Sequence, residues 1–225
     1  MNVPSASIVT QPLFFLLIAF SVALTLGYYW GRRKNRRIVH AAFDDLVKIV
    51  GPDDQNFTNI GGAIGYHANL YLRRKGPVSR VDATITLLPR QSWLYLPVSK
   101  LIRKYDRLFI TLHLERRPAG EAHLIEIRHA GYGQRTIEHS EKFTKEEVKW
   151  GRHSFYLFYK DDRMRDRFLS YIREHPEPGI IRHIAFVPKQ KRAFIFVIPE
   201  RGQVAKYVAP LYNWISGKDD RIVPE

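Results

Sequence analysis

The chain has 225 residues, 45% of them hydrophobic, and a formal net charge of +14. It contains no cysteine, which excludes disulfides, thiolate metal sites and a cysteine nucleophile. The apolar and aromatic content is high enough for a folded core, so disorder is excluded as well. The positive charge suggests an anionic partner, either lipid headgroups or RNA, although a generally basic, solvated surface would give the same sum.

An apolar segment near the N-terminus is the most informative feature of the sequence. Residues 13–30 carry no charge and end in Tyr28, Tyr29 and Trp30, whose rings suit the headgroup layer of a membrane. A helix of this length just crosses a bilayer. A soluble core helix is disfavoured, because aromatic side chains lie all round the helix and leave no polar stripe. We therefore predict a transmembrane helix at 13–30 after a short extracytosolic tail, residues 1–12.

A basic cluster follows the apolar segment and predicts its orientation: Arg32, Arg33, Lys34, Arg36 and Arg37. Positive residues stay on the cytosolic side, so the N-terminus should lie outside and the rest of the chain in the cytosol. The membrane would be that of the endoplasmic reticulum in a eukaryote or the cell membrane in a prokaryote. A cleaved secretory signal would carry its charge before the apolar run, where this sequence has none.

The first half of the remaining chain reads as a helix followed by strands. Residues 31–50 form a basic juxtamembrane segment and a helix, which has an apolar stripe from Val39 to Val50 and ends at Gly51-Pro52. Alternating patterns predict strands at 67–73, 81–87, 108–114 and 123–129, the last two paired with each other. A helix is predicted at 91–104, with Pro97 interrupting it or resetting its start.

The second half follows a charged, partly helical connector at 131–151. We predict an aromatic strand at 153–159, a helix from Asp161-Asp162 to Glu174, and a hairpin of strands 180–187 and 193–198. The second hairpin strand is apolar on both faces and should be central. A helix containing Pro210 covers 204–215, and residues 217–225 form a tail. The fold class is α+β: a cytosolic domain at 51–216, with halves 51–130 and 152–216, mostly antiparallel strands and helices on one face.

No constellation of residues indicates catalysis, a metal or a cofactor. His123 and His129 would share one side of a strand but lie roughly 20 Å apart at ~3.3 Å per residue, too far to share an ion. Gly61, Gly62 and Gly65 lack the lysine and helix of a phosphate loop, so we predict a turn or bulge. The aromatic side chains of Phe155, Phe194 and Phe196 are interpreted as core rather than as base-stacking platforms.

Basic patches are the remaining functional candidates, because several fall at predicted strand or helix ends and could converge on one edge. Besides the cluster at 32–37, they include Arg103-Lys104 and Arg116-Arg117. We assign the membrane interface to Tyr28, Tyr29 and Trp30, and contact with headgroups or RNA to the following residues: Arg32, Arg33, Lys34, Arg36, Arg37, Arg73, Arg74, Lys75, Lys189, Lys191 and Arg192.

Several segments, in this order and spacing across residues 13–216, resemble the calumin family, the coiled-coil-domain-containing subunit of the PAT complex at the translocon of the endoplasmic reticulum. They are YWGRRKNRR at 29–37, AF at 42–43, NFTNIG at 56–61, LPVS at 96–99, the strand at 107–114, FVIP at 196–199 and APLYNW at 209–214. The family's acidic luminal segment, associated with calcium binding, and its basic C-terminal coiled coil have no counterpart here. We therefore expect a short relative, of prokaryotic, for example archaeal, type.

The resemblance implies a non-enzymatic scaffold or chaperone subunit that helps multipass membrane proteins insert and fold at the ribosome-bound Sec translocon. The implied partners are an Asterix-like small membrane protein, the Sec translocon, nascent multipass proteins, ribosomal RNA and anionic headgroups. Two alternatives stay open. One is a membrane-tethered lipid- or RNA-binding module without a translocon role, and the other is a membrane-tethered enzyme with an unfamiliar site.

Overall fold

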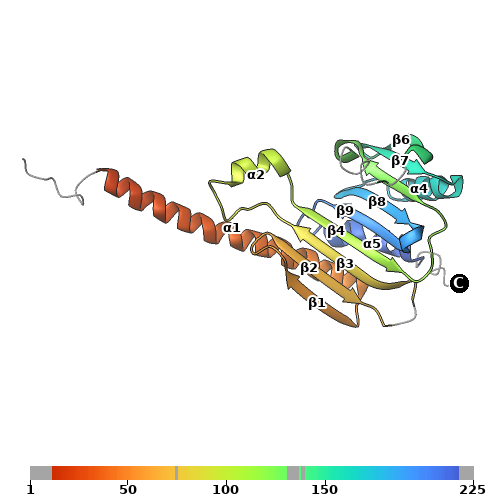
Figure 1. Ribbon diagram of the computed structural model, residues 1–225, viewed down its shortest axis with the longest axis horizontal. Coiled ribbons are helices and arrows are strands. Elements are labelled where there is room, and N and C mark those ends of the chain that lie inside the picture. Colours follow the sequence, from red (N-terminus) through yellow and green to blue (C-terminus); the bar gives the residue numbers. More distant parts are fainter. Residues whose placement is uncertain (1–11, 74–75, 131–136, 138–139, 218–225) are drawn as a thin grey trace, which may run out of the picture.

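The computed structural model describes residues 12–73, 76–130, 137 and 140–217. Within these residues the chain folds as α+β, with nine strands in a single sheet of order β1-β2-β3-β4-β9-β8-β5-β7-β6 (Figure 1). The strands are β1 Asp54–Asn59, β2 Gly65–Tyr71, β3 Val78–Thr86, β4 Arg107–Leu114, β5 Ala122–Glu126, β6 Thr144–Trp150, β7 His153–Tyr159, β8 Ile181–Val187 and β9 Arg192–Val197. The helices are α1 Pro12–Val50, α2 Leu96–Arg103, α4 Asp162–Glu174 and α5 Val204–Ser216.

Every neighbouring pair in the sheet is antiparallel. Strands from both predicted halves belong to the same sheet, because β4 pairs with β9 along its length, with Ile110 opposite Ile195. β9 is central, as the sequence predicted. The α+β class with antiparallel strands is confirmed.

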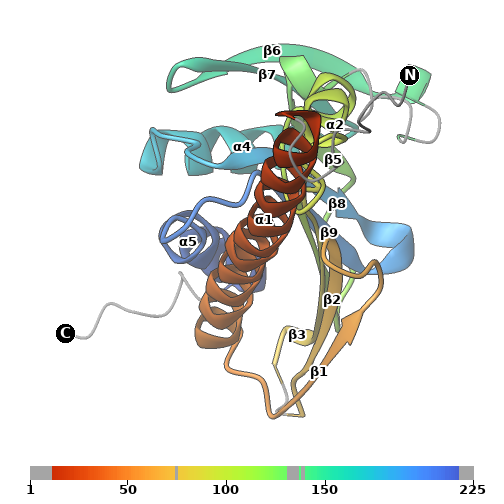
Figure 2. The same ribbon diagram turned by 90° about the vertical axis from the view of Figure 1, so that its left-hand side faces the viewer.

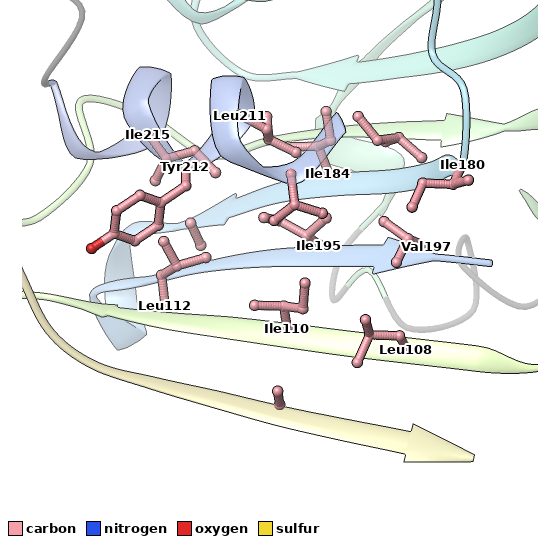
Figure 3. Packing of buried hydrophobic residues seen from close by; sticks show 14 of the residues in the cluster. Leu108, Ile110, Leu112, Ile180, Ile184, Ile195, Val197, Leu211, Tyr212 and Ile215 are labelled. Carbon is pink, nitrogen blue, oxygen red and sulfur yellow. The ribbon is translucent and has the colours of Figure 1, made fainter. Parts of the chain in front are cut away.

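Helices α1, α4 and α5 cover one face of this sheet (Figure 2). The core lies between them and the alternate strand residues that face them. Leu108 and Ile110 of β4 and Ile195 of β9 are buried beneath Leu211 of α5 (Figure 3). The period-two pattern of the strands and the helical spacing of Val204, Val208, Leu211 and Ile215 meet in this layer. The prediction that helices pack on one face is correct for α1, α4 and α5, whereas α2 lies beyond the strands (Figure 1).

α1 joins two very different environments. Its C-terminal part packs against α5 and buries Val39, Phe43 and Leu46 in the core. Its N-terminal part projects beyond the sheet (Figure 1), and only 6% of its most apolar 18-residue window is buried. By length and composition this part can cross a membrane. The predicted helices at 13–30 and 38–50 are one continuous helix, because no proline interrupts them and Arg and Lys are good helix formers.

Several local features differ from the sequence predictions. β5 pairs with β7 and β8 rather than with β4, and it ends at Glu126, so His129 lies in a 3₁₀ turn and not on the strand. The connector at 131–151 was expected to be partly helical: residues 140–142 form a 3₁₀ turn, but β6 follows it, and residues 131–136 and 138–139 lie outside the described part of the chain. β1 was not predicted, because every residue of this edge strand is exposed and gives no alternation. β2 is displaced by two residues from the predicted 67–73.

Other predictions are confirmed. Asp161 caps α4 by accepting a hydrogen bond from the backbone N–H of Arg163 (2.9 Å). Pro97 sets the start of α2 within its first turn. The glycines at 61–65 form the turn between β1 and β2, where Gly62 has a φ of 61°.

Candidate functional site

The exit of α1 from its apolar part carries the predicted interface and basic residues on its outer surface. Tyr28, Tyr29 and Trp30 are 41%, 64% and 56% exposed. Arg32, Arg33, Lys34, Arg36 and Arg37 are also exposed, and Lys34 Nζ lies 5.2 Å from the centre of the Trp30 ring. The structure therefore places aromatic rings and cations on successive turns of one helix, as a membrane boundary requires.

The opposite side of the same helix segment is a docking face made of small side chains. Gly27, Gly31 and Asn35 follow one another at intervals of four residues and are all buried. A Cβ atom on Gly27 would collide with the Trp93 ring, and one on Gly31 would collide with the backbone of Arg90. The loop before α2 thus packs directly on α1, which only glycine permits at this distance.

A buried polar network fixes this contact. Arg90 makes a bidentate ion pair with Asp106, with distances of 2.8 Å from Nη1 to Oδ1 and 2.7 Å from Nη2 to Oδ2. Arg90 Nη1 also donates to Asn35 Oδ1 (3.0 Å), and Asn35 Nδ2 donates to the backbone oxygens of Leu88 and Ala63. Asp106 further accepts from the backbone N–H of Leu88. The network ties α1 to the β1–β2 turn, to the segment after β3 and to Asp106, directly before β4.

α2 leaves this network with a large apolar surface uncovered. Leu94, Leu101 and Ile102 are 70%, 81% and 67% exposed, and Trp93, Tyr95 and Val98 are exposed as well. Apart from Phe57, Ile60 and Tyr71, all large apolar side chains that are exposed within the described ranges belong to α1 or to residues 93–102. The network and α2 lie at one end of the strands, which we call the α2 end.

Most of the remaining predicted basic patches lie at the opposite ends of the strands. Backbone hydrogen bonds join Leu72 to Ser79, Glu115 to Pro77, and Leu114 to Lys191, so the segments after β2 and β4 and the β8–β9 turn lie next to one another. We call these strand ends the hairpin end. Its exposed basic residues are Arg73, Arg116, Arg117, Lys189, Lys191 and Arg192.

The structure thus brings several patches together but separates others. Arg103 ends α2 and Lys104 follows it, at the opposite ends of the strands from Lys189. The α2 end and the hairpin end are separated by the eight residues of β4, about 26 Å at ~3.3 Å per residue. Arg74 and Lys75 lie outside the described residues. Arg73 is 78% exposed and 3.8 Å from Asp54, an ion pair too solvated to hold it firmly.

A groove of about 590 Å³ crosses the face of the sheet opposite α4 and α5. Phe109, Phe194 and Phe196 line it, with Phe109 5.1 Å from Phe196 between ring centres. Phe194 and Phe196 were predicted to be core. Phe155 is in the main core, but the other two belong to this second face of the central strand. Four cationic residues also line the groove: Arg107, Lys160, Lys189 and Arg192.

Two histidines on the groove side of the sheet are buried without a complete set of hydrogen bonds. Neither ring nitrogen of His123 has a hydrogen-bond partner, nor does Nε2 of His183. Burial lowers the pKa of His123 to about 4, Glu121 opposes this shift, and Lys160 adds to it. Burial and the neighbouring His123 lower the pKa of His183 to about 3. Both imidazoles are therefore neutral near pH 7.

Glu126 is the most heavily bonded carboxylate near the groove. It accepts hydrogen bonds from His129 Nδ1 and His153 Nδ1, each at 2.8 Å, and pairs with Arg182 at 3.2 Å. Burial alone would raise its pKa, but these hydrogen bonds and the charge of Arg182 outweigh it and lower the pKa to about 2. The partners fix the end of β5 to β7 and β8. Within the described part of the chain no three His, Asp or Glu residues are grouped to hold a metal ion.

Sequence reasoning missed the α2 end almost entirely. Two patterns point to it: the Gly27–Gly31 spacing on a helix, and the apolar spacing of Leu94, Val98, Leu101 and Ile102. Nothing in the sequence pairs Asn35 or Asp106 with Arg90. Comparison of the chain with family models and with curated proteins finds no match.

Proposed function

We propose that this protein is a non-enzymatic, membrane-anchored scaffold or chaperone subunit that assists the insertion and folding of multipass membrane proteins at a ribosome-bound Sec translocon. The proposal starts from the resemblance of residues 13–216 to the calumin family. It places the N-terminus outside and the domain in the cytosol, with an Asterix-like small membrane protein as a partner in the bilayer.

One structural observation supports the proposal most. The apolar surface and the basic surface lie at opposite ends of one sheet, and α1 runs unbroken from the first into the core. A chain built this way holds its hairpin end at a fixed distance from the membrane. Ribosomal RNA has dense negative charge, and tethering raises the local concentration of the basic surface that meets it. The hairpin end is then the ribosome contact.

Charge reversal at the hairpin tip tests this contact. The variant Lys189→Glu/Lys191→Glu/Arg192→Glu should weaken cosedimentation of the full chain with ribosomes and flatten its dependence on salt, because phosphate contacts are lost. The matched control is Lys142→Glu/Lys149→Glu/Arg152→Glu, three exposed basic residues on and around β6 with the same change in charge. Equal loss in both variants, or no loss in the first, would contradict a contact at the hairpin end.

A second function, a membrane-tethered lipid- or RNA-binding module without a translocon role, is favoured by the same cationic surfaces. Affinity purification of the full chain from membranes distinguishes the two functions. Recovery of Sec components, ribosomes and a small membrane partner supports the scaffold. Recovery of lipid or free RNA without these components supports the module.

A further inference from the structure

The apolar surface of α2 is exposed, and the proposed function leaves it unused. A helical arc joins Leu94, Val98, Leu101 and Ile102, which repeat at intervals of three and four residues, and all four are exposed. The backbone N–H of Leu96 already donates to the oxygen of Ser92 (2.8 Å), so this geometry begins before α2 itself. Exposed apolar patches of this kind mark interaction surfaces.

The position of α2 along α1 identifies what covers this surface. Trp93 lies against Gly27, which precedes Trp30, the last residue of the apolar run, by three residues, or about 4.5 Å along a helix. The segment that leads into α2 therefore contacts α1 inside its aromatic boundary. Figure 1 shows α2 beside the projecting part of α1, beyond the strands. If α1 crosses a bilayer, α2 lies at the level of the headgroups.

The polar residues of α2 suit the same location. Lys100 and Arg103 lie on the arc opposite Leu94 and Leu101, Lys104 follows directly as the residue that caps the helix, and all three are exposed. A short helix with an apolar arc on one side and cations on the other is typical of helices that lie in the plane of a membrane surface. The basic residues of α1 at 32–37 follow Gly31, on which Arg90 packs, and they too attract anionic headgroups.

We propose that α2 is an interfacial helix whose apolar arc, Leu94, Val98, Leu101 and Ile102, inserts into the cytosolic leaflet of the membrane that α1 crosses. The domain then touches the bilayer at two places, the span and α2. The rigid Arg90–Asp106–Asn35 network joins them. This second contact fixes the rotation and tilt of the domain about the span, so that the hairpin end points away from the membrane. The inference rests on the membrane span that the proposed function also requires.

The absence of cysteine from the sequence makes a direct test practical. The full chain is reconstituted in nanodiscs of phosphatidylcholine and phosphatidylserine, with a single cysteine labelled by an environment-sensitive fluorophore. Val98→Cys, Leu101→Cys and Ile102→Cys probe the apolar arc, and Lys100→Cys and Arg103→Cys on the same helix are the matched controls. Ile18→Cys probes the span.

Probes on the apolar arc should emit at shorter wavelength. They should also be quenched several-fold more by lipids brominated near the headgroup than by aqueous iodide. Probes at positions 100 and 103 should show the reverse preference. Equal access of iodide to all α2 positions, with the Ile18 probe quenched by lipid, would overturn the inference and leave the anchor intact, and would assign the apolar arc to a protein partner. An Ile18 probe open to iodide would overturn both.

Discussion

The two ends of the sheet carry similar positive charge but are built in opposite ways. At the α2 end, cations alternate with exposed aromatic and aliphatic side chains, and a buried ion pair and an amide hold the backbone in place. At the hairpin end, cations stand on turns, and Arg73 pairs with Asp54 only across solvent. The first end therefore combines an exposed apolar surface with a fixed backbone, which is what the proposed contact with the membrane requires. The second end presents exposed basic side chains on turns.

The largest expected difference between the two ends follows from removing one aspartate side chain from each. Asp106→Ala leaves Arg90 charged and mostly buried, so the free energy of unfolding should fall by about 3–5 kcal/mol. Asp54→Ala removes the exposed partner of Arg73 and should cost less than about 1 kcal/mol. Denaturant unfolding of the full chain in micelles, followed by tryptophan fluorescence, measures both. Similar losses in the two variants would show that the α2 end is no more fixed than the hairpin end.

Between the two ends, the groove should make stability depend on pH. The pKa values of His123 and His183 are lowered on folding, so the unfolded chain binds more protons than the folded chain below about pH 6.5. The two histidines therefore leave the free energy of unfolding unchanged above that pH and lower it as the pH falls toward 4. Each group contributes a slope of up to about 1.4 kcal/mol per pH unit.

The variant His183→Phe removes one of these groups and keeps a ring of similar shape. Its free energy of unfolding should fall about 2 kcal/mol less than that of the parent chain between pH 6.5 and 4.5. Glu126 acts in the same direction but at lower pH, because its own pKa is lowered to about 2. Parallel pH profiles for the two chains would refute the assignment of the loss to His183.

Two glycine substitutions test how tightly the loop before α2 packs on α1. Alanine favours a helix over glycine by about 1 kcal/mol, so both changes should stabilise a free helix. Gly31→Ala should nevertheless destabilise the protein, by about 1–2 kcal/mol, since its Cβ meets the backbone of Arg90. Gly27→Ala should cost less, because the exposed Trp93 ring can move. The same unfolding assay compares them, and a gain in stability for Gly31→Ala would contradict tight docking.

Sequence patterns predicted those parts whose residues interact locally. The Asp161 cap, the hairpin around residues 188–191 and the terminal helix follow from capping, alternation and helical spacing. Long-range pairing was not accessible in this way: the partners of β5 come from residues 153–187, and no local rule selects them over β4. Edge strands β1 and β6 were missed or mistaken because one exposes every residue and the other is densely charged.

The candidate functional surfaces likewise include parts that follow from local sequence patterns and parts that depend on long-range contacts. The aromatic and basic exit of α1 follows from composition, and the grouping of Arg73, Arg116 and Lys189 at one edge follows from strand ends. The docking of α2 depends on the absence of a side chain at Gly27 and Gly31, and on one arginine that meets an amide 55 residues away. Such contacts become visible only when the fold brings the segments together.

The orientation of the domain is the claim on which the rest depends, and single-cysteine accessibility tests it most directly. Lys191→Cys at the hairpin end and Val98→Cys on α2 are expressed in the full chain, and sealed vesicles of known sidedness are treated with a membrane-impermeant maleimide. The account predicts that Cys at position 191 reacts only when the cytosolic face is outward, and that position 98 reacts slowly on either side until detergent is added. Rapid reaction at position 191 from the extracytosolic face would contradict it.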